Sequence, residues 1–249
     1  MNIGVYGMGR FGAFWARHLA AIGEVYAYNR SEGRQYPDSV RHATLEELVA
    51  CDVIVLCVAI SAFKDVVGTL ADIVRPGTLV MDTCSVKKYP ATVMESLLPA
   101  SVSIIATHPM FGPDSGKDGI AGLPMVYCPI RCDEALSASW KAKFESLQLN
   151  VLEMDCDRHD KEAAYSQGVT HFVGRVLDEL HLNPTELSTL GYKNLMSIVE
   201  QTCNDPIQLF YDLQRFNPYA HAMHTELKRA LDAVISALDQ QDSSGWKRS

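Results

Sequence analysis

The sequence predicts an α/β fold: a doubly wound, mostly parallel sheet followed by a smaller all-helical domain. Short apolar runs alternate with helical stretches over the first 155 residues. These runs are rich in valine and isoleucine without strict alternation, which is typical of strands covered on both faces. From about Asp157 onward no strand-like run appears and helical patterns take over. We therefore expect two domains, residues 1–156 and residues 157–249.

The individual elements follow from these patterns in chain order. The expected strands are residues 2–7, 25–29, 53–59, 78–84, 103–108, 124–129 and 150–155. Between them we expect helices at residues 10–22, 44–49, 62–74, 88–98 and 134–147. The short second helix carries a capping box, because Thr44 is followed three residues later by Glu47. Repeated strand–helix–strand order predicts a parallel sheet with helices on both faces.

The C-terminal part contains four expected helices, at residues 160–180, 185–203, around 206–215, and 219–239. In the last of these, apolar residues recur at steps of three and four, which gives one apolar stripe. So small a helical domain has little core of its own. We therefore expect it to pack on the sheet domain and on a second copy of the chain, giving a homodimer.

Composition and charge exclude several classes of protein. The net charge of −8, without a basic stripe, argues against nucleic-acid binding. No apolar run reaches the ~18 residues of a membrane span, and the N-terminus enters a strand directly instead of resembling a signal peptide. The seven cysteines are odd in number and form no C-x-x-C pair, which indicates reduced thiols in a cytoplasmic protein. The histidines form no cluster with metal-ligand spacing, so we expect no metal.

The first expected strand runs into Gly7-Met8-Gly9-Arg10-Phe11-Gly12 and then into a helix. In this context Gly7 permits the tight turn, Gly9 lets the backbone approach a pyrophosphate, and Gly12 lets helix and strand pack closely. Free N–H groups at the helix start then hold the phosphates. We expect a Rossmann-type dinucleotide site formed by Gly7, Gly9, Arg10, Phe11 and Gly12. The alternative is a simple strand–helix turn.

The end of the second strand indicates which dinucleotide binds. Sites that prefer NAD usually place Asp or Glu here to bind the ribose 2′-hydroxyl. This strand instead ends in Tyr28-Asn29-Arg30-Ser31. Because Asn29, Arg30 and Ser31 can donate to a 2′-phosphate, the sequence predicts NADP, with NAD less favoured. The alternative is that Arg30 is a solvated surface charge.

An imidazole follows the fifth long apolar run, in the stretch Thr107-His108-Pro109-Met110-Phe111-Gly112-Pro113. Ligands of doubly wound sheets bind beyond the carboxyl ends of the strands. Ser85 follows the preceding strand, so we expect Ser85 and His108 to lie near each other and near a nicotinamide. A neutral histidine accepts a proton near neutral pH, and a neighbouring hydroxyl can orient the substrate oxygen.

A second histidine stands in the helical part. Helical spacing places Gln167, His171 and Arg175 on one face, and Gly168 and Gly174 leave room for a close approach. The alternative is a core histidine with a local partner.

Together these residues resemble the prephenate/arogenate dehydrogenase family of tyrosine biosynthesis. The motifs that carry the resemblance are DTCSVK at residues 82–87, THPMFGP at 107–113, HDKEAAYSQGVTHF at 159–172 and VEQTCNDPIQLFYDL at 199–213. The last block is most similar to plant-type arogenate dehydrogenases. The resemblance implies an N-terminal nucleotide-binding domain and a C-terminal helical dimerisation domain.

The resemblance also implies an activity and residue roles. Family members decarboxylate prephenate or arogenate oxidatively, pass a hydride to NAD or NADP, and yield 4-hydroxyphenylpyruvate or tyrosine. His108 matches the catalytic histidine that bonds the ring hydroxyl, and Ser85 matches the serine that orients this hydroxyl. Gln167 and His171 match a helical pair that contacts the substrate.

Two departures from the family pattern bear on the substrate. Bacterial prephenate enzymes have an arginine within the region of residues 199–205, where this chain offers only Glu200 and Asp205. A carboxylate favours the ammonium of arogenate over the keto group of prephenate, so we expect Asp205 to bind substrate. The alternative is that Asp205 caps the helix that begins at Pro206. Asp114 follows the family motif where Glu or Thr is common, and it is a second candidate substrate contact.

Two other functions are compatible with part of the pattern. The first is an NADP-dependent hydroxyacid or imine dehydrogenase, with Lys193 as the helical lysine that such enzymes use. The second is a non-catalytic NADP-sensing module, which needs the glycine loop but not His108, Ser85, Gln167 and His171 together.

Overall fold

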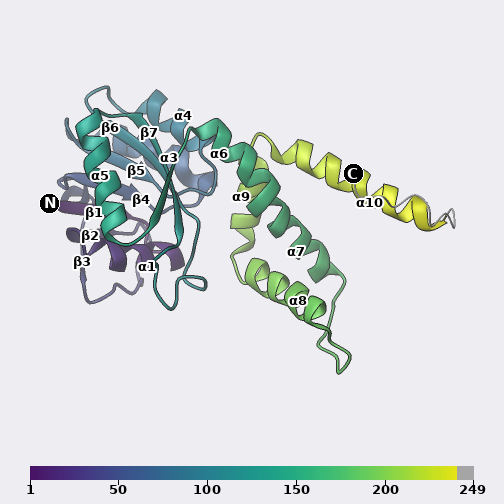
Figure 1. The fold of residues 1–249 in the computed structure, drawn as a ribbon. Coiled ribbons are helices and arrows are strands. Elements are labelled where there is room, and N and C mark those ends of the chain that lie inside the picture. The colour runs from purple at the N-terminus through teal and green to yellow at the C-terminus, as the bar shows by residue number, and fades with distance from the viewer. Residues whose placement is uncertain (240–249) are drawn as a thin grey trace.

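In the computed structural model, which describes residues 1–239, the first 153 residues form an eight-stranded sheet with helices on both faces (Figure 1). The strand order is β3-β2-β1-β4-β5-β6-β7-β8, and all neighbours are parallel except β6 and β7. The strands are β1 (Asn2–Tyr6), β2 (Glu24–Tyr28), β3 (Val40–His42), β4 (Val53–Leu56), β5 (Leu79–Asp82), β6 (Ser103–Pro109), β7 (Pro124–Arg131) and β8 (Asn150–Glu153). The strand order reverses at β1, between β2 and β4, which is where such sheets bind ligands.

The two faces of the sheet carry separate hydrophobic cores. On one face α2 (Leu45–Val49), α3 (Ile60–Ala71) and α4 (Lys88–Leu97) bury Leu48, Phe63 and Met94. On the other face α1 (Arg10–Leu19) and α5 (Glu134–Ser146) bury Trp15, Trp140 and Phe144. Burial on both faces explains why the strands read as continuous apolar runs. The predicted doubly wound fold is confirmed.

The capping box predicted at Thr44 is present. The Glu47 N–H donates to Thr44 Oγ1 at 3.2 Å, and the Thr44 N–H donates to Glu47 Oε2 at 2.8 Å. These two bonds satisfy free donors at the helix start. They fix where α2 begins, before the chain enters β4.

Two expectations for this region were wrong in detail. The three-residue edge strand β3 was not expected; it pairs in parallel with β2 and is too short to show a period. The helix expected from residue 62 begins at Ile60. Its start is stabilised from elsewhere in the chain, since Asp212 accepts the Ser61 N–H at 3.0 Å and the Ser61 hydroxyl at 3.1 Å.

The C-terminal part consists of helices. The helix expected at residues 160–180 is a continuous rod of α6 (Cys156–Ala163), a π-helical turn η1 (Ala164–Gly168) and α7 (Val169–Glu179). The helix expected from residue 185 begins later, as α8 (Leu190–Cys203), because Thr189 caps it by accepting the Tyr192 N–H at 3.2 Å. The last two helices are α9 (Ile207–Phe216) and α10 (Ala220–Asp239).

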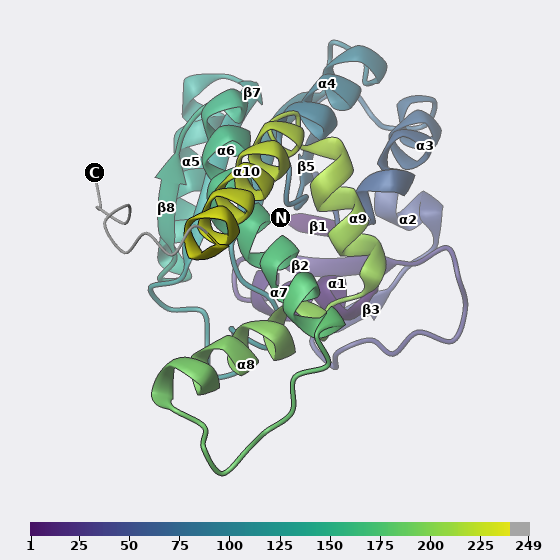
Figure 2. The same ribbon diagram turned by 90° about the vertical axis from the view of Figure 1, so that its right-hand side faces the viewer.

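The helical part contacts the sheet part chiefly through α6 and α9. Contacts join α6 to α4 and α9 to α3, whereas α7 and α8 pack on each other further out (Figure 1). In Figure 2 α10 points toward the viewer, away from the sheet, and α9 lies beside α3. Large apolar side chains on α10 stay exposed, among them Leu231, Ile235 and Leu238. Within residues 1–239, no helix combines the length and apolar character needed to cross a bilayer.

Candidate active site

A cavity of about 430 Å³ lies where the carboxyl ends of the strands meet the helical part. It is lined by the glycine loop, by the segments that follow β4, β5 and β6, and by residues of η1, α7, α8 and α9. The sequence-predicted residues that line it are Gly9, Arg10, Phe11, Gly12, Ser85, His108, Asp114, Gln167, His171 and Asp205. Residues drawn from the whole chain therefore converge on one site.

The glycine loop has the shape that a pyrophosphate requires. Gly7 has a positive φ of 104°, and a Cβ there would lie 2.4 Å from the Cys57 carbonyl oxygen. A Cβ on Gly12 would lie 1.8 Å from the Gly7 carbonyl oxygen, so helix and loop touch. Gly9, by contrast, faces open space, where a Cβ would meet nothing within 4 Å. The loop is therefore closed behind and open in front, and this geometry fits a dinucleotide.

The end of β2 is joined to the glycine loop by Asn29. Its Oδ1 accepts the Met8 N–H at 2.9 Å, and its Nδ2 donates to the Ser31 carbonyl oxygen at 2.8 Å. The Asn29 amide is thus engaged with the backbone. The side chains of Arg30 and Ser31 are exposed, and neither residue lines the cavity.

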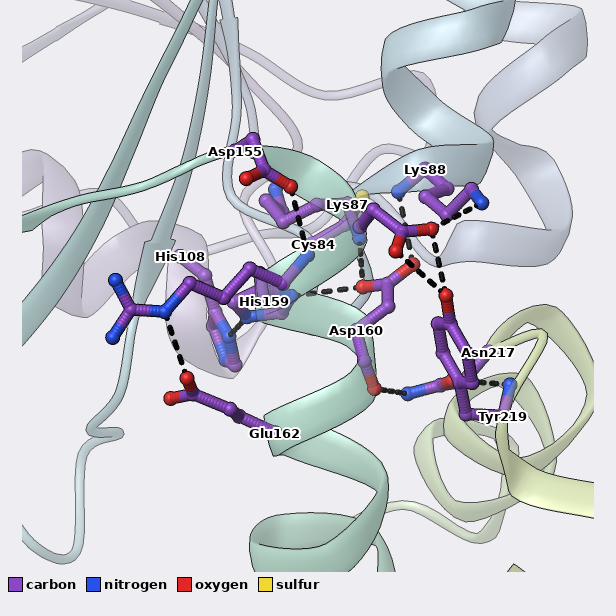
Figure 3. Close-up of polar contacts among 12 residues, drawn as sticks. Cys84, Lys87, Lys88, His108, Asp155, His159, Asp160, Glu162, Asn217 and Tyr219 are labelled. Carbon is purple, nitrogen blue, oxygen red and sulfur yellow. Dashed lines mark hydrogen bonds and ion pairs between the residues drawn. The ribbon is translucent and has the colours of Figure 1, made fainter. Parts of the chain in front are cut away.

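His108 lies at the end of β6 and is only 3% exposed. Its Nδ1 is 2.9 Å from His159 Nε2, and His159 Nδ1 is 2.8 Å from Asp160 Oδ1 (Figure 3). Burial lowers the pKa of His108 well below its ordinary value, and the nearby His159 and Lys87 lower it further. The ring is therefore neutral at neutral pH and able to accept a proton.

Backbone donors hold the carboxylate at the far end of this line. Asp160 Oδ1 accepts the Lys87 N–H at 2.7 Å, and Asp160 Oδ2 accepts the Lys88 N–H at 3.0 Å (Figure 3). These donors stand at the free N-terminus of α4, where a negative charge is stabilised. Asp160 thereby bonds α6 to the start of α4, in the sheet part of the molecule.

A buried ion pair fixes the strand end that carries His108. Lys87 and Asp82 are both fully buried and bonded to each other, and Lys87 Nζ also donates to the Thr107 carbonyl oxygen. Burial opposes the charged form of Lys87, but its neighbours, the Asp82 carboxylate first among them, together outweigh burial, so the pKa of Lys87 is raised. Lys87 therefore stays protonated and ties β5 to β6 beside the imidazole.

Three of the residues that line the cavity each have a buried polar atom without a hydrogen-bond partner: Ser85 Oγ, Gln167 Oε1 and His171 Nδ1. Buried polar groups are nearly always paired, so three such atoms at one cavity indicate a polar ligand. The widened turn of η1 contributes Gln167, and π-helical turns are frequent at functional sites. Burial lowers the pKa of His171, with Arg175 adding to the effect and Asp205 opposing it.

Arg175 behaves differently from its two neighbours on that helix face. It does not line the cavity, and its guanidinium donates to the Thr202 and Asp205 carbonyl oxygens at 3.1 Å each. It thereby holds the end of α8 against α7. Of the three residues at helical spacing, two face the cavity and the third supports its wall.

Three charged side chains, Arg10, Asp114 and Asp205, form the part of the cavity lining that we call the outer wall. Arg10, the first residue of α1, is ion-paired with Asp114 and lies 3.7 Å from Asp205. Asn204 Nδ2 also donates to Asp114, at 3.4 Å. Burial raises the pKa of Asp205, while His171 and Arg10 oppose that rise. Asp205 does not cap α9, because the cap position is Pro206 and no side chain bonds there.

Sequence reasoning missed Gln201, Gln208 and Asp212, which line the cavity, and it also missed His159 and Asp160, which lie behind His108. The adjacent His-Asp pair stands at the start of the 159–172 motif, which was the one signal available. The contact with His108 spans 51 residues and depends on how α6 packs. Lys193, in turn, is exposed on α8 and lies outside the cavity. Among residues 1–239, no cluster of three or more His, Cys, Asp or Glu side chains could hold a metal ion.

Comparison with known proteins gives consistent matches along the chain. The family model described as prephenate dehydrogenase, nucleotide-binding domain, matches residues 27–129. The model described as TYRAAT1-like, C-terminal domain, matches residues 176–248. Arogenate dehydrogenase 2, chloroplastic, of Arabidopsis thaliana is 34% identical over 252 residues, which cover 96% of this chain and 70% of that protein. Arogenate dehydrogenase 1, chloroplastic, of the same plant is 35% identical over 88% of this chain but only 36% of its own length.

Solved structures share the fold. Prephenate dehydrogenase from A. aeolicus, in complex with hydroxyphenyl propionate and NAD+, aligns with a TM-score of 0.74 and 18% identity, covering 97% of this chain and 91% of that one. Synechocystis arogenate dehydrogenase aligns with a TM-score of 0.70 and 20% identity, covering 97% and 93%.

Proposed function

Because this chain belongs to the prephenate/arogenate dehydrogenase family, we propose that it decarboxylates arogenate oxidatively, in preference to prephenate, with NADP as the hydride acceptor. The observation that carries the proposal is the composition of one cavity. An open glycine cradle, a buried neutral imidazole and three residues with an unpaired polar atom line it together.

The residues around the glycine loop support a phosphorylated dinucleotide. Gly9 and the start of α1 would hold the pyrophosphate, and Arg30 and Ser31 would bind the 2′-phosphate. No carboxylate stands at the end of β2 to repel that phosphate. A bound nicotinamide dinucleotide supplies the acceptor for the hydride that leaves C4 of the substrate ring.

The protein's own contribution is to orient the ring and take one proton. His108 accepts the proton of the C4 hydroxyl, and Ser85 Oγ orients this hydroxyl toward the imidazole. As C4 becomes a ketone, the bond from C1 to the ring carboxylate can break into the conjugated system, which releases CO2 and leaves an aromatic ring. A well-placed base contributes about 10²- to 10⁴-fold to such a step. Gln167 and His171 hold the polar substituents of the substrate from the helical side.

The outer wall supports arogenate as the preferred substrate. Arogenate and prephenate differ only in the side chain, which carries an ammonium in the first and a keto group in the second. Asp205 and Asp114 line the cavity and can bind that ammonium. Arg10 supplies the positive charge on this wall. Its ion pair with Asp114 is partly exposed, so Arg10 can also bind a carboxylate of the substrate.

The remaining proposals concern organisation. We assign nucleotide binding to residues 1–156 and dimerisation to residues 157–249, of which the last ten lie outside the described residues. The exposed apolar side chains of α10 support a homodimer through the helices. Seven free cysteines support a reducing compartment, for which we propose the cytoplasm.

One assay tests the reaction. The purified protein is given arogenate or prephenate with NADP or NAD, and formation of the reduced cofactor is followed by absorbance. We expect the highest kcat/KM for arogenate with NADP. If neither substrate reduces either cofactor, the proposal is wrong; NADP binding without turnover would then favour a sensing module.

A further inference from the structure

We propose that His159 and Asp160 form a proton relay behind His108, which selects the tautomer of His108 and takes up the positive charge that forms when His108 accepts the proton of the substrate. The inference rests on the proposed oxidation and extends it to two positioning residues that do not line the cavity.

The relay is a continuous line of hydrogen bonds from β6 to α6. The His108–His159 contact is 2.9 Å and the His159–Asp160 contact is 2.8 Å. Figure 3 shows the two rings and the carboxylate in sequence, with His159 between the other two. His108 and His159 are each 3% exposed and Asp160 is fully buried, so water does not compete for these bonds.

The backbone fixes the direction of every proton in the line. Asp160 accepts N–H groups from Lys87 and Lys88, so it is held as a carboxylate and accepts from His159 as well. His159 therefore carries its proton on Nδ1 and presents the lone pair of Nε2. That lone pair requires a proton on His108 Nδ1. The Nε2 of His108 is left unprotonated, and it is the ring nitrogen available to the cavity.

The same line accommodates the proton that is removed. The O–H bond of substrate breaks and a bond forms to His108 Nε2, while the hydride and its electron pair leave with the nicotinamide acceptor of the proposed reaction. The proton on His108 Nδ1 moves to His159 Nε2, while His159 keeps its Nδ1 proton and donates it as a hydrogen bond to Asp160 Oδ1. The positive charge is thereby neutralised by a carboxylate.

The surroundings make this neutralisation necessary. Burial and the cationic Lys87 disfavour a charged His108, and they lower its pKa. The other titratable groups around the line are Asp82, which pairs with Lys87, and Cys156, Lys88 and Tyr219, which lie near Asp160. Asp160 is the carboxylate in direct contact with the imidazole pair.

The tautomer can be observed without turnover. We expect ¹⁵N NMR of the imidazole nitrogens in the wild-type protein to show His108 protonated on Nδ1 and unprotonated on Nε2. His159 should show the same pattern, and His108→Asn assigns the signals. A proton on His108 Nε2 in the resting protein overturns the relay.

Asp160→Asn tests the relay in turnover, and Asp157→Asn is its matched control. Asp157 lies three residues earlier at the start of the same helix, is exposed, and bonds Lys88 and Tyr219 instead of a histidine. An amide at position 160 can still accept from His159 through its oxygen, but it carries no negative charge and no longer stabilises a proton taken up by the imidazole pair. We expect kcat to fall about 10²- to 10⁴-fold with the Kd of NADP unchanged, whereas Asp157→Asn keeps wild-type kcat. Equal kcat values in the two variants overturn the relay.

The pH profile separates a relay from a merely structural role. Without the carboxylate, the imidazolium of His108 is less stable and its pKa falls. The acid limb of kcat/KM should therefore move to lower pH in Asp160→Asn and stay in place in Asp157→Asn. An unmoved limb in Asp160→Asn contradicts the relay.

A second variant guards against a folding defect at position 160. In His159→Gln the amide oxygen accepts the His108 Nδ1 proton but cannot pass it on, so the tautomer of His108 is kept while kcat falls. Full activity in His159→Gln overturns proton transfer. The relay and the proposed reaction can fail separately. If the wild-type protein reduces the cofactor but NMR shows His108 protonated on Nε2, only the relay is wrong. If NMR shows the expected tautomer but neither substrate is oxidised, only the proposed reaction is wrong.

Discussion

The inner and outer walls of the cavity hold their polar groups in different ways. On the inner wall, His108 is buried, and so are the groups behind it, His159, Asp160 and the Lys87–Asp82 pair; backbone groups bond Asp160 and Lys87. On the outer wall, the side chains of Arg10, Asp114 and Asp205 are 42%, 48% and 31% exposed. Water screens the outer charges and leaves them free to exchange partners. The comparison teaches that fixed groups suit proton transfer, whereas exchangeable groups suit recognition of a charged substituent.

The largest expected effect comes from replacing His108, the catalytic residue of the inner wall. His108→Asn should lower kcat by about 10²- to 10⁴-fold, because the base is lost while the glycine loop is untouched. Steady-state turnover and the Kd of NADP, measured by fluorescence titration, check both parts. Near-normal turnover would exclude His108 as the base.

The next effect compares the buried ion pair behind the inner wall with the exposed ion pair of the outer wall. Lys87→Met leaves the Asp82 carboxylate buried without its partner, so the free energy of unfolding should fall by about 3–5 kcal/mol. Asp114→Asn, which breaks the exposed pair with Arg10, should leave it nearly unchanged. Urea unfolding of both variants measures the contrast, and equal losses would refute the difference between the walls.

A smaller effect concerns the cofactor. Arg30→Ala removes one charge-assisted contact to the 2′-phosphate and should raise the KM for NADP about tenfold. The KM for NAD should stay the same, because NAD lacks this phosphate. If the KM for NADP does not change, Arg30 is only a surface charge.

The outer wall should control substrate choice by a still smaller factor. Asp205→Asn removes a partly screened partner of the ammonium, so the ratio of kcat/KM for arogenate to that for prephenate should fall by about fivefold. Initial rates with the two substrates give the ratio. If the ratio does not change in favour of prephenate, Asp205 does not determine the substrate preference.

The smallest effect is on the pH profile of the wild-type protein. Turnover needs neutral His108, and burial lowers the pKa of this histidine. The acid limb of kcat/KM should therefore lie below ~6.5, the ordinary histidine value. Rates measured across the acid range give the limb, and a limb above that value would contradict the buried His108 as the group responsible for it.

Particular residues show how far sequence reasoning reached. The glycine loop and the stretch from Thr107 to Pro113 could be placed because each follows an apolar run that must end at the same edge of a parallel sheet. Gln167 and His171 were found through helical spacing, although the π-helical turn at Gln167 has no local signature. Asp205 was a candidate both for substrate binding and for capping, and the position of Pro206 at the start of α9 removed the second role.

Local sequence was enough to predict the long apolar strands, their two covered faces and the motifs at the strand ends, because each depends on residues that are neighbours in the chain; it was not enough for the three-residue strand β3. Tertiary structure alone decided that His159 lies behind His108 and that Asp205 lies near Arg10. The reason is physical: a period of apolar residues specifies which face of a helix is buried, but not which side chain of a distant strand it meets there.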